Sequence, residues 1–177
     1  KYIFSQDHKM IAKQYLFTGV IFMGIIGILM SSLMRMQIAW PEEPNIIFEF
    51  LLGKWAPEGV MDADIYLALV TMHGTIMVFF VLTAGLSGTF SNLLIPLQLG
   101  ARDMATGFLN MLAYWLFFVS TVLMVASIFV EAGPAAAGWT IYPPLSALEI
   151  AQPGSAAGMT LWLVSMAFFI ASSLLAA

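Results

Sequence analysis

The chain has 177 residues, of which 61% are hydrophobic and only 9% are charged, and its formal net charge at pH 7 is -4. A soluble domain needs more charge on its surface, so this composition excludes an ordinary soluble protein and indicates a membrane protein. The negative net charge gives no support for nucleic-acid binding. Because cysteine is absent, disulfides and thiolate metal sites are excluded, and the polar start of the sequence is not typical of a secretory signal.

Four stretches that contain no acidic or basic residue predict four transmembrane helices. A spanning helix needs about 20 mainly apolar residues, and each stretch reaches that length. The predicted helices cover residues 11–39, 64–93, 105–130 and 157–177, with longer connections at 40–63 and 131–156. We therefore expect an all-α fold, a polytopic transmembrane helix bundle. The last stretch runs to Ala177 without a polar stop, so we expect the N-terminal part of a single longer membrane domain.

Local signals refine the ends of the second helix and the connection before it. Asp62 or Asp64 is a suitable N-cap, and Pro96 is expected just beyond the end of that helix. Residues 46–55 are expected to form a short amphipathic helix at the membrane interface. Four apolar side chains support it, because they share one helical face: Ile46, Ile47, Phe50 and Leu51.

The distribution of charge predicts the orientation of the helices. Basic residues precede the first helix and follow the second: Lys1, Lys9, Lys13 and Arg102. The opposite side is acidic: Glu42, Glu43, Glu49, Glu58, Asp62, Asp64, Glu131 and Glu149. This bias places the N-terminus and the connection at 98–105 in the cytoplasm. Interfacial aromatic residues are then expected at the outer boundary: Trp40, Trp55, Tyr66, Trp139 and Tyr142.

His73 is the first candidate for a chemical role, because it lies in the uncharged stretch 65–101. An ionisable side chain in hydrocarbon is costly and needs a partner. Neutral imidazole is a good ligand for iron or copper, and Gly74 beside it would let a flat macrocycle approach the backbone. A histidine that bonds to a neighbouring helix explains the position equally well, so both interpretations remain open.

Arg35 is the second candidate, at the outer end of the first apolar stretch. Its position alone favours a side chain that extends to the outer headgroups. The functional alternative is a guanidinium that donates hydrogen bonds to a polar substituent of a heme. Since Arg35 and His73 both fall in the outer half of the predicted bilayer, one cofactor could meet both.

The third group consists of Asn92, Asp103 and Asn110 near the cytoplasmic ends of the second and third helices. Asp103 could simply cap the third helix, and the asparagines could bond between helices. The functional alternative is a proton inlet, in which the carboxylate collects protons and the amides orient a file of water.

The outer segment Gly138–Leu145 contains two prolines and several aromatic residues. Prolines fix the backbone and aromatic side chains could form a lid over a site. A rigid interfacial loop without chemistry is the alternative, and the pattern does not decide between them.

With these residues in place, the chain resembles subunit I of the heme-copper oxygen reductases, most closely the cytochrome c oxidase type. The resemblance covers nearly the whole chain and would correspond to the first four helices of a subunit of about twelve. It is carried by short motifs in a specific order: Asp7-His8-Lys9, Arg35, His73-Gly74, Gly88-Thr89-Phe90-Ser91-Asn92, Pro96-Leu97, Gly100-Ala101-Arg102-Asp103-Met104-Ala105, Asn110, Glu131-Ala132-Gly133 and Gly138-Trp139-Thr140-Ile141-Tyr142-Pro143-Pro144-Leu145.

The resemblance implies a role for each matching residue. His73 matches one of two axial histidines of a low-spin heme, and Arg35 matches the arginine at the formyl group of heme A. Gly74 and Trp139 would lie near that heme, Trp139 beside its propionates. The proton channel would be formed by the matching polar residues, which are Asp103, Asn92 and Asn110. No ligand role is implied for His8, which we expect to be an exposed cytoplasmic residue.

The resemblance also implies what the whole protein does. A terminal oxidase passes electrons through the low-spin heme to a heme–copper centre, reduces oxygen to water and pumps protons. The second axial histidine, the high-spin heme ligand and the copper ligands belong to later helices, so this segment alone is expected to be inactive. The expected partners are the rest of subunit I, a copper-bearing subunit II, a subunit III, cytochrome c or another donor, and lipid. The expected location is the bacterial inner membrane.

Two departures from the family pattern concern the inlet. Arg102 stands where the family usually has proline, and its cation would repel protons beside Asp103. Where the family usually reads Pro-Arg-Met-Asn-Asn, this chain has residues 107–111, Gly-Phe-Leu-Asn-Met, so one asparagine is kept and its neighbour is replaced. The acidic segment 40–61 is also unusual, and we expect it to dock a subunit or a cytochrome.

Rival functions remain at this point. A quinol oxidase or a nitric oxide reductase would belong to the same superfamily, although the Asp103 group argues against the reductase. A transporter could use His73 and Asp103 to bind a substrate or protons. A membrane subunit without catalytic function would need neither residue for chemistry.

Overall fold

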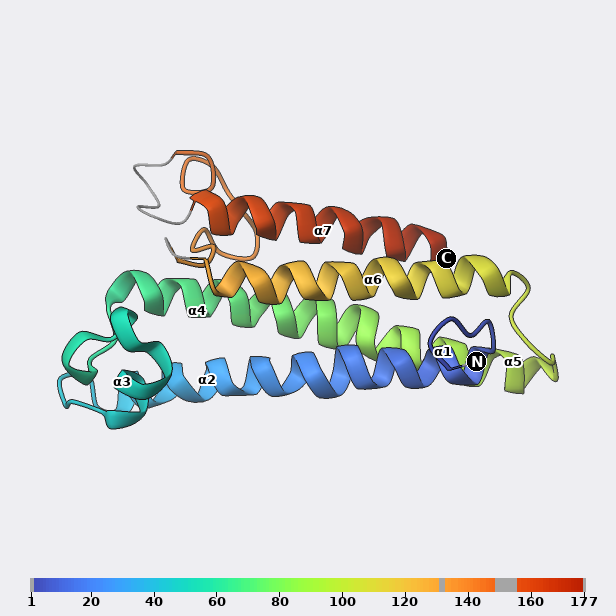
Figure 1. Cartoon of the computed structure of the whole chain (residues 1–177), viewed down its shortest axis with the longest axis horizontal. Helices are drawn as coiled ribbons and strands as arrows, with labels where there is room; N and C mark the ends of the chain where they lie inside the picture. The colour runs from blue at the N-terminus through green and yellow to red at the C-terminus, as the bar shows by residue number, and fades with distance from the viewer. Residues whose placement is uncertain (1, 131–132, 149–155, 177) are drawn as a thin grey trace. The chain divides into compact units, whose positions relative to one another are not determined.

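In the computed structural model the chain is mainly helical, and residues 2–130, 133–148 and 156–176 are described (Figure 1). No β-strand occurs among them, which confirms the all-α prediction. The helices in chain order are α1 (His8–Tyr15), η1 (Leu16–Phe22), α2 (Met23–Ala39), α3 (Ile46–Leu52), η2 (Gly53–Trp55), η3 (Pro57–Gly59), α4 (Ala63–Thr75), η4 (Ile76–Leu86), α5 (Ser87–Leu99), α6 (Gly107–Ile128) and α7 (Ala156–Ala176). The expectations for Lys1, Glu131, Ala132 and Glu149 lie outside the described residues.

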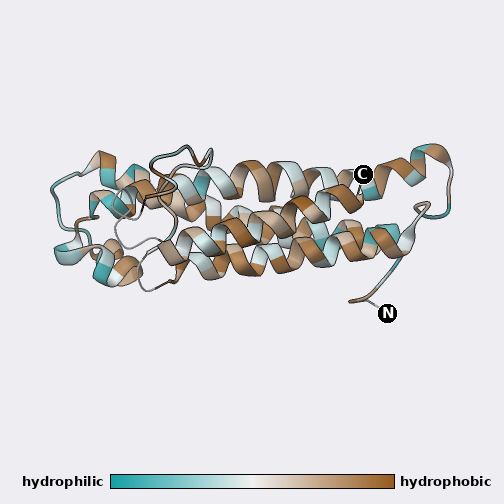
Figure 2. Ribbon diagram, turned by 90° about the horizontal axis from the view of Figure 1, so that it is seen from above, coloured by the Kyte–Doolittle hydropathy of each residue, from teal (hydrophilic) through white to brown (hydrophobic). Residues whose placement is uncertain are grey.

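Four uninterrupted helical segments are long and apolar enough to cross a membrane: His8–Ala39, Ala63–Leu99, Gly107–Ile128 and Ala156–Ala176. The shortest has 21 residues and so extends for roughly 32 Å, which matches a hydrocarbon core about 30 Å thick. Hydrophobic residues, coloured brown, recur along the length of these segments (Figure 2), as is typical of membrane helices. The chain is therefore a polytopic membrane protein.

The described residues form two compact units. One unit consists of Lys1–Ile25, Ile76–Ala126 and Leu161–Ala177, and the other of Ile26–Thr75 and Ser127–Thr160. In the first unit Phe117 packs against Tyr15 and Phe80, with ring centroids 5.2 and 5.8 Å apart. Ser120 and Ser165 donate their hydroxyls to each other's carbonyl oxygens at 2.8 and 2.7 Å, so α6 and α7 are joined by buried polar bonds as well as by aromatic packing.

Two carboxylates accept backbone amides at the start of the first helix. The side chain of Asp7 accepts the Lys9 amide at 2.8 Å, and Asp103 Oδ1 accepts the His8 amide at 3.1 Å. Both satisfy N–H groups that the first turn of a helix leaves free. The alternative in which Asp103 caps the third helix does not hold, because α6 begins at Gly107 and its first turn is closed by the Asn110 amide on the Thr106 carbonyl.

The expectation that Pro96 lies beyond the second helix is also wrong, because α5 continues through it to Leu99. The helix ends instead at Gly100, which has a φ of 67°, a value that favours glycine. The Gly100 amide bonds to Leu97 and the Ala101 amide to the Pro96 carbonyl, which together close the last turn. A proline interrupts a helix by removing one donor, and a donor from another helix replaces it, as described below.

The connection between α2 and α4 contains the predicted amphipathic helix. Asn45 caps it by accepting the Ile47 amide at 2.9 Å, and α3 covers residues 46–52 of the predicted 46–55. Phe48 is only 1% exposed, whereas Ile46 and Phe50 are 80% and 85% exposed. The helix α3 therefore has a buried side within its own unit and an exposed apolar side. The helix α4 follows, and the Tyr66 amide closes its first turn by donating to the Asp62 carbonyl.

Two π-helical segments of the first unit touch at a pair of glycines. A Cβ atom on Gly19 of η1 would lie 2.6 Å from the Gly85 Cα atom of η4, and a Cβ on Gly85 would lie 3.2 Å from Gly19 Cα. Real side chains do not approach a backbone so closely, so only glycine permits this contact. The wider turns of a π-helix change which residues of the flanking α-helical turns share a face. The sequence predicted neither π-helical segment.

Replacing Gly19 by alanine should therefore lower the stability of the complete membrane complex. The added methyl group would meet backbone atoms of η4, which cannot rotate away, and overpacking of this kind costs about 1–3 kcal/mol. The midpoint of thermal inactivation checks this. Gly24→Ala is the matched control, because nothing lies within 4 Å of a Cβ atom at that position, and equal midpoints for the two variants would contradict the prediction.

Candidate functional site

His73 lies half-buried in the last turn of α4 and is held against α2. Its Nδ1 atom lies 2.9 Å from the carbonyl oxygen of Gly27. A carbonyl oxygen only accepts hydrogen bonds, so Nδ1 must carry the proton in this pair. The histidine thus has the interhelical partner that a polar group in hydrocarbon requires.

The same bond leaves the other ring nitrogen available. In a neutral imidazole with the proton on Nδ1, the lone pair on Nε2 can bind a metal. Metal-binding histidines characteristically donate their second nitrogen to a carbonyl or carboxylate, which fixes both tautomer and ring orientation. The two interpretations of His73 are therefore compatible, because Nδ1 makes the bond to Gly27 and Nε2 keeps a lone pair that is able to bind a metal.

One histidine such as His73 is sufficient for a single ligand position of a heme. No group of three or more His, Asp or Glu side chains that could hold a metal ion occurs among the described residues. A bare zinc or copper ion takes several ligands from protein. A heme iron needs only axial ligands from the chain, so a single histidine fits that cofactor.

The loop residue Trp139 lies against the backbone of α4 beside His73. A Cβ atom on Gly74 would lie 3.2 Å from Trp139 Cδ1, and the Gly138 amide donates to Thr71 Oγ1 at 2.9 Å. The Thr71 hydroxyl donates in turn to the Leu67 carbonyl at 3.0 Å. The indole ring of Trp139 thus borders the space that a side chain at Gly74 would fill in this structure. Thr71, which the sequence did not single out, anchors the loop.

Replacing Gly74 by valine should displace the Trp139 ring, because a branched side chain would overlap the indole. The loop at residues 133–148 should then be cleaved faster by an added protease in the complete complex, by about fivefold, which corresponds to roughly 1 kcal/mol of lost contact. Trp139→Ala should have a similar effect, and the double variant should be no worse than either, since both remove one contact. Additive effects of the two substitutions would contradict this contact.

Arg35 is exposed and lies eight residues beyond Gly27 on α2, hence roughly 12 Å further along the helix. No hydrogen bond joins it to His73 within the part of the chain that the structure describes. The backbone of Arg35 therefore lies about two helical turns along α2 from the residue that bonds to His73.

The two asparagines of the predicted inlet are joined directly. Asn92 and Asn110 are 3% and 5% exposed, and the Asn110 amide donates to Asn92 Oδ1. The amide of Asn92 donates to the Gly88 carbonyl at 2.8 Å. The pair therefore bridges α5 and α6 with both side chains fixed, and such amides can orient water that reaches them.

Asp103 is exposed and is connected to Asn92 through His8. His8 is 3% exposed, and its Nδ1 atom lies 2.7 Å from the Asn92 carbonyl oxygen, while its amide donates to Asp103. The expectation that His8 is exposed is therefore wrong. The reason is helical periodicity, because His8 shares the buried face of α1 with Ile11, Ala12 and Tyr15.

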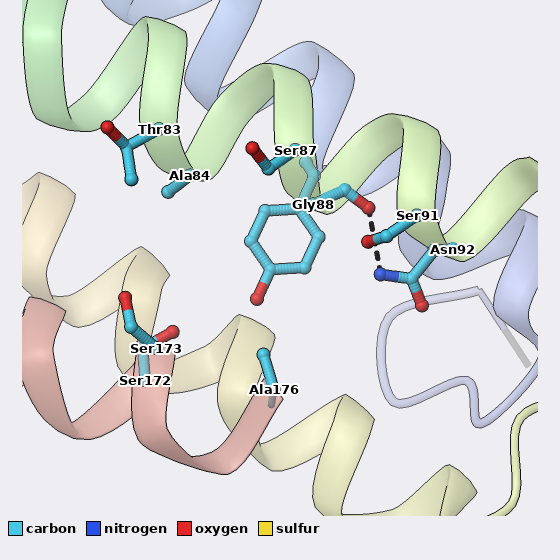
Figure 3. A pocket seen from close by; sticks show the side chains of 10 residues that line it. Thr83, Ala84, Ser87, Gly88, Ser91, Asn92, Ser172, Ser173 and Ala176 are labelled. Atoms are coloured by element: carbon cyan, nitrogen blue, oxygen red, sulfur yellow. Dashed lines mark hydrogen bonds between the residues drawn. The ribbon is translucent and has the colours of Figure 1, made fainter. Parts of the chain in front are cut away.

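A pocket of about 250 Å³ that has several hydroxyl groups in its lining adjoins the asparagine pair within the same unit (Figure 3). Ser172 and Ser173 of α7 lie across it from Ser87 and Ser91 of α5. A water molecule occupies about 30 Å³ in the liquid, so the pocket has room for several. Its complete lining consists of Tyr15, Thr83, Ala84, Ser87, Gly88, Ser91, Asn92, Ser172, Ser173 and Ala176.

Sequence reasoning missed most of this lining. Tyr15 can lie against α5 only because Gly88 has no side chain, since a Cβ there would come within 2.7 Å of the tyrosine ring. The hydroxyls of α5 and α7 gave a weak signal, because serine is common where membrane helices pack. The arrangement brings an exposed carboxylate, a buried imidazole, two amides and a hydroxyl-lined pocket into one unit.

Comparison with known proteins gives a consistent result. The family model described as cytochrome c and quinol oxidase polypeptide I matches residues 10–177. The alternative cytochrome c oxidase subunit 1 of Bradyrhizobium diazoefficiens is 42% identical over 170 residues, which is 96% of this chain and 26% of that protein. The cytochrome c oxidase subunit 1 of Thermostichus vulcanus is 37% identical over 174 residues, 98% of this chain and 27% of that protein.

A third relative is the heme-copper oxidase subunit I+III of Aeropyrum pernix, 38% identical over 172 residues, which cover 97% of this chain and 18% of that protein. The chain thus spans about a quarter or less of the length of these three relatives.

Proposed function

Because this chain belongs to the family of cytochrome c and quinol oxidase polypeptide I, whose cofactors are heme and copper, we propose that it forms the N-terminal part of the catalytic subunit of a cytochrome c oxidase. The observation that carries the proposal is the hydrogen bond between His73 Nδ1 and the Gly27 carbonyl. It holds the ring of a membrane-buried histidine in the tautomer that leaves Nε2 free to bind iron.

His73 is proposed as one axial ligand of a low-spin heme of type A, with the second ligand supplied from outside this segment. His73 would hold this heme, which would supply one-electron transfer toward a heme–copper centre that reduces oxygen to water. Trp139 would cover the cofactor from the outer side beside Gly74, and Arg35 would donate to a polar substituent at its edge. Each of these side chains binds and orients, and none transfers a proton.

The second contribution of the segment is a proposed proton inlet. Asp103 is exposed and able to exchange protons with water, and the paired amides of Asn92 and Asn110 lie behind it. Water in the adjoining pocket would receive hydrogen bonds from the hydroxyls of Ser87 and Ser91. The chain would thereby supply a hydrated path that leads protons toward the reaction centre and the pump.

The whole protein would act with partners. We propose the rest of subunit I, a copper-bearing subunit II and a subunit III, and the name of the Aeropyrum pernix relative, which joins subunits I and III, supports the last. The relatives named cytochrome c oxidase support cytochrome c as the electron donor. We place the protein in the bacterial inner membrane with its N-terminus in the cytoplasm, on the basis of the basic residues Lys9, Lys13 and Arg102.

Turnover of the complete complex with different donors tests this function. Oxygen consumption with reduced cytochrome c, together with a low-spin heme signal in the reduced-minus-oxidised spectrum, is the expected result. Activity with a quinol alone would make the enzyme a quinol oxidase, and reduction of nitric oxide without oxygen reduction would make it a nitric oxide reductase. A complex without heme signals would overturn the proposal in favour of a transporter or a subunit without catalysis.

A further inference from the structure

Pro96 leaves one carbonyl oxygen of α5 without its usual donor. In an α-helix the carbonyl of residue i accepts the amide of residue i+4, and the partner of the Asn92 carbonyl would therefore be residue 96. Proline has no amide hydrogen. Asn92 is 3% exposed, so water does not readily replace the missing donor, and an unsatisfied buried carbonyl is costly.

His8 supplies the missing hydrogen bond from a different helix. Its Nδ1 atom is 2.7 Å from the Asn92 carbonyl oxygen, across 84 positions of sequence. Because the carbonyl only accepts, the imidazole donates, and its proton lies on Nδ1. His8 itself is fixed by its buried position and by the bond from its amide to Asp103 at 3.1 Å.

The residue that receives this bond also forms the amide pair of the inlet. The side chain of Asn92 donates to the Gly88 carbonyl at 2.8 Å and accepts from Asn110. A change in the position of the Asn92 backbone would therefore move the paired amides and the wall of the pocket that Asn92 lines. Residues from three separate motifs, His8, Pro96 and Asp103, meet at this point.

We propose that His8 is a positioning residue of the proton inlet: it replaces the amide hydrogen that Pro96 lacks and so holds the Asn92–Asn110 pair where water can pass. This inference rests on the proposed inlet and adds a residue for which no role was expected. It assigns His8 a bond to a main-chain oxygen and no proton transfer of its own.

The experiment measures proton uptake by the complete oxidase in lipid vesicles during a single turnover, with the low-spin heme spectrum as a readout of assembly. His8→Leu removes the donor and should slow uptake about tenfold, the upper range for a lost hydrogen bond. His8→Asn places an amide nitrogen near the former Nδ1 position and should remain within about twofold of the unsubstituted enzyme, since it keeps the donor without a titratable ring.

A double substitution tests the role of Pro96 directly. Pro96→Ala restores a backbone amide at position 96, which can bond to the Asn92 carbonyl within α5. In that background His8→Leu should slow uptake by no more than about threefold, because the carbonyl no longer depends on the imidazole. If His8→Leu is as harmful with Pro96→Ala as without it, His8 does not act through this carbonyl.

The remaining outcomes also decide the question. If His8→Asn is as slow as His8→Leu, the imidazole ring itself is needed and the positioning role of His8 is refuted. If proton uptake by His8→Leu is normal, His8 has no role in the inlet. If His8→Leu does not assemble, His8→Gln takes its place in the experiment. His8→Gln should also slow proton uptake about tenfold, because its amide nitrogen lies near the former Nε2 position and does not reach the Asn92 carbonyl. Normal uptake by His8→Gln would overturn the proposal. Asp103→Asn in the same assay distinguishes failure of the proposed inlet from failure of the role of His8. Normal proton uptake in Asp103→Asn would refute the inlet itself.

Discussion

Replacing His73 by alanine should remove the low-spin heme band from the reduced-minus-oxidised spectrum of the complete oxidase. The substitution deletes the only nitrogen that the Gly27 bond leaves free for iron. Loss of a partner in the outer shell of a metal site already costs 10–100-fold in affinity, so loss of the ligand should cost more than about a hundredfold. Oxygen consumption should fall in parallel, because electrons could not reach the reaction centre.

The controls for this prediction lie on the same helix. Leu67→Ala changes a side chain of α4 that is 53% exposed and should leave the heme band unchanged. His73→Gly in the presence of added imidazole should restore part of the band, because free imidazole can enter the space and bind the iron. A normal low-spin band in His73→Ala would show that another residue is the ligand and would refute the assignment.

The fold could be predicted from the sequence to the extent that it depends on local composition. Uncharged stretches of sufficient length predict the four helices, since each backbone group must be satisfied within its own helix in lipid. The end of the second helix could not be predicted, because α5 continues past Pro96 with a bond from His8 to Asn92, two residues that lie 84 positions apart. Such a donor is a tertiary contact and leaves no trace in the local pattern.

The two π-helical segments escaped prediction for a similar reason. The glycines Gly19 and Gly85 are readable in the sequence, but apolar glycines occur in many membrane helices. Their pairing depends on which turns of η1 and η4 face one another. The pattern of hydrophobic residues fixes that register poorly when a helix is apolar on every side.

At the candidate site, side-chain chemistry allowed single residues to be predicted from the sequence, whereas their contacts are seen only in the structure. His73 stood out because an ionisable group in hydrocarbon is costly, but its partner is a backbone carbonyl, which no sequence pattern reveals. The missing side chain of Gly74 leaves space that the Trp139 ring borders in this structure, and the contact of Gly74 with a heme stays a prediction. The roles of Arg35 and Trp139 toward a heme stay predictions.

Replacing Asp103 by asparagine should slow proton uptake by the complete oxidase about a hundredfold, the lower limit for loss of a group that transfers protons. Asparagine keeps an Oδ1 atom that can accept the His8 and Met104 amides, which Asp103 holds at 3.1 and 2.8 Å. The cap of α1 should therefore survive, and only the ionisable group is lost. Transfer of electrons into the low-spin heme should remain fast, because the substitution leaves His73 and its bond to the Gly27 carbonyl unchanged.

Asp7→Asn is the matched control, since Asp7 is also an exposed carboxylate at the start of α1 and accepts the Lys9 amide at 2.8 Å. Both substitutions remove one negative charge from the same end of the helix and keep an acceptor for its first turn. If the carboxylates act only by attracting protons to the surface, the two variants should be slowed equally. If Asp103 is the mouth of the inlet, only Asp103→Asn should be slow, because only this carboxylate is joined through His8 to the amide pair and the pocket behind it.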